Sequence, residues 1–148
     1  MTVMSTLKNL LAGLGGAVAL NILHESLKKT GNDMPRIDLL GEEALQKSLN
    51  QFGAAIKDPD TLYAATLGGD LISNSVYYSM IGMGNPKNIW SKAVVLGLAA
   101  GIGAVTLPKP LGLNPQPVAK NTQVKVLTVG YYLFGALVTA GIISMQEK

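Results

Sequence analysis

The stretch LYAATLGGDLISNSVYYSMIGM, residues 62–83, carries a single charged side chain, Asp70, near its middle. Its 22 residues fall within the roughly 17–25 that an α-helix needs to cross the hydrocarbon core of a bilayer. An acidic side chain inside such a helix is costly in lipid, so it marks a candidate functional site. The segment therefore predicts a membrane-spanning helix and makes Asp70 the first residue to examine.

Three similar apolar stretches share this pattern. Each holds one lysine within about a turn of an end: Lys8 in residues 7–23, Lys92 in 89–107 and Lys125 in 124–145. Lysines at such ends are typical anchors at lipid headgroups. Only 14% of residues are charged, against roughly a quarter in soluble domains. We expect an all-α, four-helix transmembrane bundle, one integral membrane domain over residues 1–148, with spans near 6–30, 61–83, 88–107 and 123–145. A very apolar soluble helical bundle is the alternative.

Residues 38–57 differ, because apolar side chains recur there at helical spacing among charged ones. We expect an amphipathic helix that lies in the membrane interface between the first two spans. Packing against the loop end of the bundle is the alternative. Ser5 is the expected N-cap of the first span. The proline-rich link at residues 108–117 is expected to be rigid and extended.

The basic residues favour one orientation in the membrane. Eight Lys and Arg residues lie in the loops after the first and third spans, and four lie on the other side. The positive-inside rule then places those two loops in the cytoplasm and both termini outside. A net charge of +3, scattered along the chain, gives no stripe for nucleic acid. The absence of cysteine excludes disulfides and thiolate ligands.

Small residues recur at fourfold spacing in every predicted span, which lets helices approach closely in lipid. The rows are Gly13 and Ala17; Ala65, Gly69 and Ser73; Ala93, Gly97 and Gly101; and Gly135 and Thr139. They predict close helix packing, either within one chain or between copies in a homo-oligomer.

Two polar stripes interrupt the apolar pattern. Asp70, Asn74 and Tyr78 share one helical face of the second span. Toward the end of the first span, a second stripe consists of Asn21, Glu25 and Lys28, with His24 beside it. Antiparallel neighbours would bring the two stripes to similar depth, so we expect a buried cluster in which Asp70 contacts His24, Lys28 or Asn74. These five residues, His24, Glu25, Asp70, Asn74 and Tyr78, are the candidates for ligand or proton binding. The alternative places His24 at the headgroup boundary.

The residue pattern gives little support for an enzymatic function. A metal site from His24, Glu25 and Asp70 would lack a second histidine, so neither metal nor cofactor is expected. A Ser-His-Asp set would need Ser26, Ser73 or Ser75, and none of them lies in a nucleophile-elbow pattern. The sequence names no reaction and favours a role other than catalysis.

The function expected from these features is that of an accessory or scaffold subunit, an interaction protein in a larger membrane complex. The first alternative is a homo-oligomeric, proton-coupled small-molecule transporter that uses Asp70, whose pKa burial would raise. The second is a protein that binds lipid or another hydrophobic ligand. The bilayer is the common partner in all three.

Three short segments resemble a known group of proteins: His24-Glu25, residues 35–41 (PRIDLLG) and Gly69-Asp70-Leu71. They are similar to segments of small, uncharacterised bacterial four-span membrane proteins. The resemblance implies the bacterial inner (cytoplasmic) membrane as location, and it implies no activity.

Overall fold

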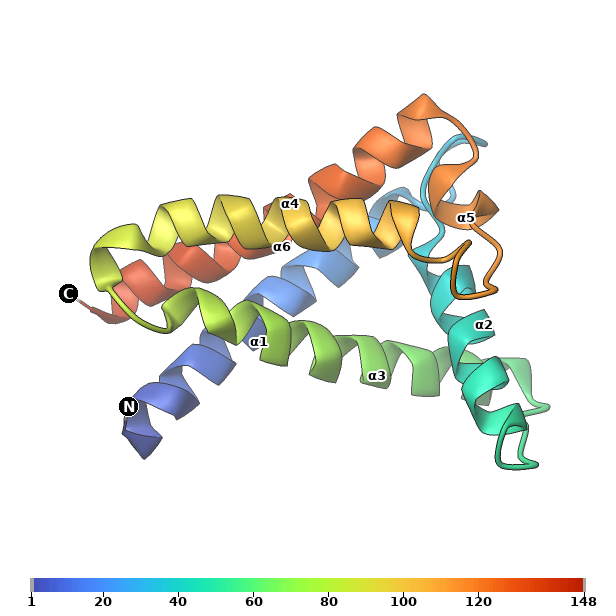
Figure 1. Ribbon diagram of the computed structural model, residues 1–148, viewed down its shortest axis with the longest axis horizontal. Helices are drawn as coiled ribbons and strands as arrows, with labels where there is room; N and C mark the ends of the chain where they lie inside the picture. Colours follow the sequence, from blue (N-terminus) through green and yellow to red (C-terminus); the bar gives the residue numbers. More distant parts are fainter. Residues whose placement is uncertain (1, 148) are drawn as a thin grey trace.

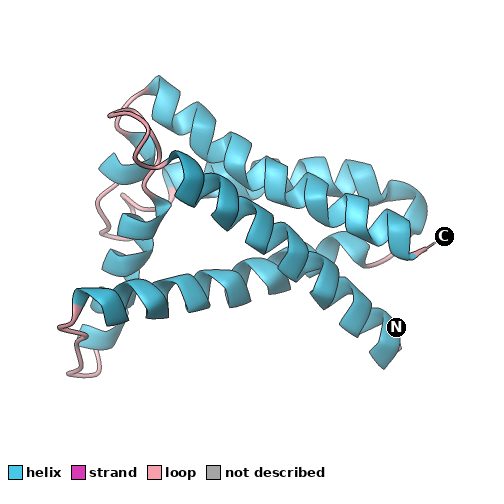
Figure 2. Cartoon of the chain, turned by 180° about the vertical axis from the view of Figure 1, so that it is seen from behind, coloured by secondary structure: helices cyan, strands magenta, loops and turns pink. Residues whose placement is uncertain are grey.

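The computed structural model describes residues 2–147, a range that contains helices and loops but no β-strand (Figure 1; Figure 2). Four long helices form the bundle: α1 (Val3–Leu27), α3 (Pro59–Ser79), α4 (Ile89–Thr106) and α6 (Thr122–Gln146). The shorter helices lie at one end or in the turn between α3 and α4: α2 (Ile37–Asn50), α5 (Gln116–Ala119), η1 (Met80–Gly82) and η2 (Pro86–Asn88). The all-helical prediction is confirmed.

Three of the helices are long and apolar enough to cross a membrane: α1, α4 together with η2, and α6. The segment α3 has 21 residues but is not among them, because Asp70, Asn74 and several serines lower its apolar content. Large apolar side chains such as Leu11, Ile22 and Val95 are exposed on the outer faces of the bundle. This surface is typical of a membrane protein, whereas four spans remain a prediction.

Helices α1 and α6 form the centre of the bundle, with α3 packed on α1 and α4 packed on α6. Small residues set these distances. A Cβ added to Gly97 would lie 2.8 Å from Ala136 Cβ, and one added to Gly101 would lie 2.6 Å from Val129 Cα. The small-residue rows of α1, α4 and α6 are thus used within the chain. The row of α3, by contrast, is exposed along Ala65, Gly69 and Ser73.

Helices α3 and α4 are close together where the chain turns from one into the other, and they diverge from there (Figure 1). They diverge because α3 packs on α1, whereas α4 packs on α6. Their common end contains the main hydrophobic core, in which Tyr78, Ile81 and Ile89 are buried. Helix α2 crosses the opposite, wide end of this wedge (Figure 2). Helices α3 and α4 thus form a hairpin whose two arms are splayed.

The first helix begins earlier and ends earlier than the predicted 6–30. Thr2, not Ser5, is its N-cap: the Thr2 hydroxyl accepts the Ser5 amide, and the Ser5 hydroxyl accepts the Thr2 amide. This capping box satisfies two free amides of the first turn. The other long helices start and end within a few residues of the predicted spans.

The prediction of a helix over residues 38–57 is wrong at its C-terminal end. Helix α2 ends at Asn50, since Gly53 adopts a φ of 74° and the Ala54 amide donates to the Leu49 carbonyl. This is a glycine C-cap of the Schellman type, which the apolar spacing alone did not reveal. The extended residues that follow are held to α2 by Gln46, whose side chain both donates to and accepts from the Ile56 backbone.

The prediction of an extended link at residues 108–117 is also wrong. The Leu113 amide donates to the Pro108 carbonyl, and Gly112 has a φ of 79°, so this part is a tight turn. The one-turn helix α5 follows, with Pro117 in its first turn. Proline is tolerated there because an amide in that position has no helical partner.

Candidate functional site

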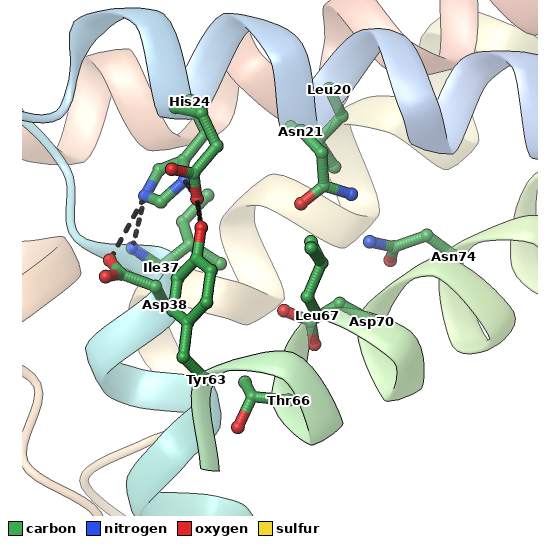
Figure 3. A pocket seen from close by; sticks show the side chains of 11 residues that line it. Leu20, Asn21, His24, Ile37, Asp38, Tyr63, Thr66, Leu67, Asp70 and Asn74 are labelled. Carbon is green, nitrogen blue, oxygen red and sulfur yellow. Dashed lines mark hydrogen bonds and ion pairs between the residues drawn. The ribbon is translucent and has the colours of Figure 1, made fainter. Parts of the chain in front are cut away.

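A small cavity lies where α1, the N-terminal end of α2, and α3 meet (Figure 3). Its volume is about 20 Å³, which is sufficient for one water molecule. The polar residues that line it are Asn21, His24, Glu25, Asp38, Tyr63, Thr66, Asp70 and Asn74. The hydroxyl of Thr66 is buried and has no hydrogen-bond partner among the described residues. The cavity therefore suits a water molecule that bridges polar groups of α1 and α3.

His24 is buried at the α1 side of this cavity, with 3% of its surface exposed. Its Nε2 accepts a hydrogen bond from the Ile37 amide at 3.1 Å and lies 3.4 Å from Oδ1 of Asp38 (Figure 3). Nε2 can carry either a lone pair or a proton, so only one of these contacts is favourable at a time. A ring with a lone pair on Nε2 accepts from the Ile37 amide, and a ring with a proton on Nε2 donates to the Asp38 carboxylate.

Asp38 is the centre of an ionic cluster that we define as Glu25, Lys28, Arg36, Asp38 and Tyr63. Arg36 donates two hydrogen bonds to the Asp38 carboxylate, at 3.0 and 2.8 Å. Lys28 Nζ lies 2.7 Å from a Glu25 oxygen and 3.7 Å from an Asp38 oxygen. The Tyr63 hydroxyl donates to Glu25. The cluster thus connects the end of α1, the start of α2 and the start of α3.

The charge of Asp38 is strongly favoured in this setting. Burial disfavours the carboxylate, but the His24 ring and the Arg36 guanidinium outweigh burial and hold the pKa of Asp38 well below its ordinary value. Asp38 also lies in the first turn of α2, where the helix dipole favours a negative charge. Glu25 and Asp38 in turn outweigh burial at Lys28 and raise its pKa.

Asp70 lines the same cavity, yet it makes no hydrogen bond or ion pair with any described residue. The predicted contact of Asp70 with His24, Lys28 or Asn74 is therefore not formed, because Asp38 and Glu25 occupy the histidine and the lysine. Figure 3 shows Asp70 and Asn74 on α3, apart from the His24–Asp38 pair. Gly41 of α2 lies next to Asp70, and a Cβ added to this glycine would be 3.5 Å from a carboxylate oxygen of Asp70.

A groove of about 560 Å³ opens in the wedge between α3 and α4, on the other side of Asp70. Most of its wall is apolar and comes from α2, α4 and the turn after α4: Leu40, Ala44, Ala99, Ala100, Gly103, Ala104, Leu107, Leu111 and Leu113. Its polar lining consists of Asp70, Ser73 and Asn74 with two tyrosines, Tyr77 and Tyr132. Asp70 and Asn74 line both the small cavity and this groove.

Not every predicted site residue belongs here. Tyr78 is fully buried in the hydrophobic core, and its hydroxyl donates to the Tyr132 carbonyl at 2.7 Å. The serines are not brought to His24: the hydroxyls of Ser26 and Ser75 donate to carbonyls of their own helices. In the described part of the chain, no group of three or more His, Asp and Glu residues has the spacing of a metal site.

Sequence reasoning did not identify the partner of His24. Asp38 was read as the start of an amphipathic helix, and the spacing of 13 residues between Ile37 and His24 gives no periodic signal. One clue to a buried position near Asp38 was Pro35. This proline is buried and lies two residues before the start of α2. Tyr132 was also missed, because it lies in an apolar span and enters the groove only through the splay of α3 and α4.

Compared with models of protein families, with curated proteins and with solved structures, the chain matches none.

Proposed function

We propose that this protein is an integral membrane protein that binds a hydrophobic ligand in the groove between α3 and α4. The observation that carries the proposal is the groove itself, with its apolar wall and a polar spot at Asp70 and Asn74. Ligand sites in proteins are usually clefts of about 300–1,000 Å³, mostly apolar, with a few polar groups that orient the ligand. The volume and the lining of this groove fit that description.

The helices around the groove support entry from the bilayer. Small side chains such as Ala99, Ala100 and Ala104 line the α4 wall and leave room for an alkyl chain. Leu107 and Leu111 at the wide end are largely exposed. An apolar ligand dissolved in the membrane would reach such a groove without crossing water.

The same proposal includes four spans and an interfacial α2. A helix of 21 residues is about 31 Å long, enough to cross the bilayer core, and α3 runs along α1, which is itself apolar enough to span. Helix α2 crosses the end of the bundle and exposes Leu39, while Phe52 beyond it is 86% exposed. Exposed apolar groups at that level favour contact with the headgroup boundary. The resemblance to small bacterial membrane proteins favours the inner membrane.

Binding of decanol to the protein in nanodiscs tests the ligand-binding proposal. We expect saturable binding to the wild type and its loss in Ala100→Phe, because a ring on the α4 wall fills the groove. Val95→Phe is the matched control, since Val95 lies on the same helix and is 65% exposed on the outer face. Equal binding to all three proteins, or no saturable binding to any, would contradict the proposal.

A second candidate is the accessory or scaffold role, as a homo-oligomer or in a larger complex. The observation that favours it is the exposed small-residue row of α3, where a Cβ added to Gly69 would meet nothing within 4 Å. Rows of this kind allow a partner helix to approach closely in lipid. Purification from native membranes under mild detergent tests this role: a stoichiometric partner lost in Gly69→Leu supports it, and a monomer without partners contradicts it.

A further inference from the structure

Asp70 is the one acidic side chain that lines the groove, and no Lys, Arg or His is among the described residues that line it. The two basic side chains of the ionic cluster are engaged elsewhere: Lys28 pairs with Glu25, and Arg36 holds Asp38 through two hydrogen bonds. His24, in the small cavity behind Asp70, contacts the Ile37 amide and Asp38. The groove therefore presents a carboxyl group to its occupant, and none of the described side chains that line the groove is basic. A bound group that supplies a positive charge would complement it.

Asp70 has neighbours in the groove lining whose side chains carry oxygen atoms that can accept hydrogen bonds. Asn74 lies one turn along α3 and Ser73 lies between them in sequence, and both line the groove beside the carboxyl group. Tyr132 contributes a phenol from α6. A primary ammonium group has three N–H donors, so it can bond to the carboxylate and two further oxygens at once.

We propose that the preferred occupant of the groove is a single-chain amphiphile with a primary ammonium head, which Asp70 binds while the alkyl chain lies along α4. This inference rests on the proposed ligand-binding function and names its ligand class. An ethanolamine phospholipid also carries an ammonium group. It would, however, bring a phosphate, for which the groove offers no basic side chain.

Gly41 of α2 lies beside the carboxyl group of Asp70. A methyl group added there would lie 3.5 and 3.6 Å from the two Asp70 oxygens and 2.7 Å from Thr66 Cγ2. The absence of a side chain at this crossing thus lets α2 pass close to Thr66 and Asp70, and a head group would reach Asp70 from the groove that this residue lines.

Calorimetric titration of the full chain, in nanodiscs that contain only phosphatidylcholine, tests the proposal with three probes: decylamine, decanol and decanoate. We expect decylamine to bind the wild type at least roughly tenfold more tightly than decanol, as a hydrogen-bonded charge pair predicts, and decanoate to bind weakest. In Asp70→Asn, decylamine should fall to the affinity of decanol, while decanol is unchanged. Asp60→Asn, an exposed acid at the start of α3, is the matched control and should keep the preference.

Each other outcome has a defined meaning. Equal affinity of decylamine and decanol for the wild type overturns the inference but leaves the ligand-binding function standing, and this comparison needs no variant to fold. A preference for decylamine that survives in a folded Asp70→Asn also overturns it. Displacement of decylamine by added phosphatidylethanolamine overturns the choice of a single-chain ligand. Failure of all three probes to bind saturably instead contradicts the proposed function.

Discussion

The two ends of the bundle are held together in different ways. At the end where α3 joins α4, helices meet through small residues and a buried apolar core that includes Tyr78 and Ile81. At the other end, α3 and α4 have separated, and the ionic cluster around Asp38 connects α1, α2 and α3. The shared apolar core fills the space between α3 and α4 at the first end, whereas at the second end the two helices are apart and a groove opens between them. The comparison teaches that the groove lies where α3 and α4 no longer share a hydrophobic core.

Substitution of a glycine between the two central helices, α1 and α6, should lower the free energy of unfolding more than any other change considered below. In Gly16→Ala, the new methyl group would collide with Thr139 and the Gly135 carbonyl of α6, so we expect a loss of about 3 kcal/mol in unfolding free energy. Thermal unfolding in detergent, followed by circular dichroism, measures it. Gly69→Ala on α3 is the control and should be neutral or slightly stabilising, since nothing lies near its added methyl group. Equal midpoints for the two variants would show that α1 and α6 are not in such close contact.

Removal of the charge at Asp38, in the ionic cluster, should lower the free energy of unfolding by a smaller amount. We expect Asp38→Asn to lose about 2 kcal/mol, because two charge-assisted hydrogen bonds from Arg36 are weakened. Asp33→Asn is the matched control from the same loop. It pairs with Lys120 at 3.3 Å but is half exposed, so its loss should stay below about 1 kcal/mol. If both variants unfold like the wild type, the cluster does not hold α2 in place.

The contribution of Asp38 should also depend on pH. Its folded-state pKa lies below the ordinary value of 3.8, so the charged carboxylate stabilises the fold fully above that value. That stability is lost as the pH falls toward the folded pKa. The difference in unfolding midpoint between the wild type and Asp38→Asn should therefore be full at about pH 7 and shrink below about pH 4. If this difference in midpoint instead grows as the pH falls, the pKa of Asp38 is not lowered by folding.

Much of the fold was predictable because the absence of charged residues from long apolar stretches is a local signal. This signal predicted the four long helices to within a few residues, and the apolar spacing placed the start of α2 at residue 38, one residue after its observed start at Ile37. The end of α2 escaped because it depends on one glycine, Gly53, in a left-handed conformation.

The site was predictable only in part. His24, Glu25, Asp70 and Asn74 do line one cavity, as their helical positions suggested. The pairing of His24 with Asp38 and the groove were not predictable, since both depend on where α2 crosses and how far α3 and α4 diverge. Such tertiary geometry leaves no periodic trace in a sequence.

The central claim is that the wedge between α3 and α4 receives an amphiphile. Photolabelling in nanodiscs with an alkylamine that carries a diazirine on its chain, followed by peptide mass spectrometry, tests it most directly. The account predicts that labels concentrate on the α4 wall, residues 99–107, and on Ser73 and Tyr77 of α3, and that excess decylamine abolishes them. Labels spread evenly over the exposed outer faces, Leu11 and Ile22 of α1 included, and insensitive to decylamine, would contradict the claim.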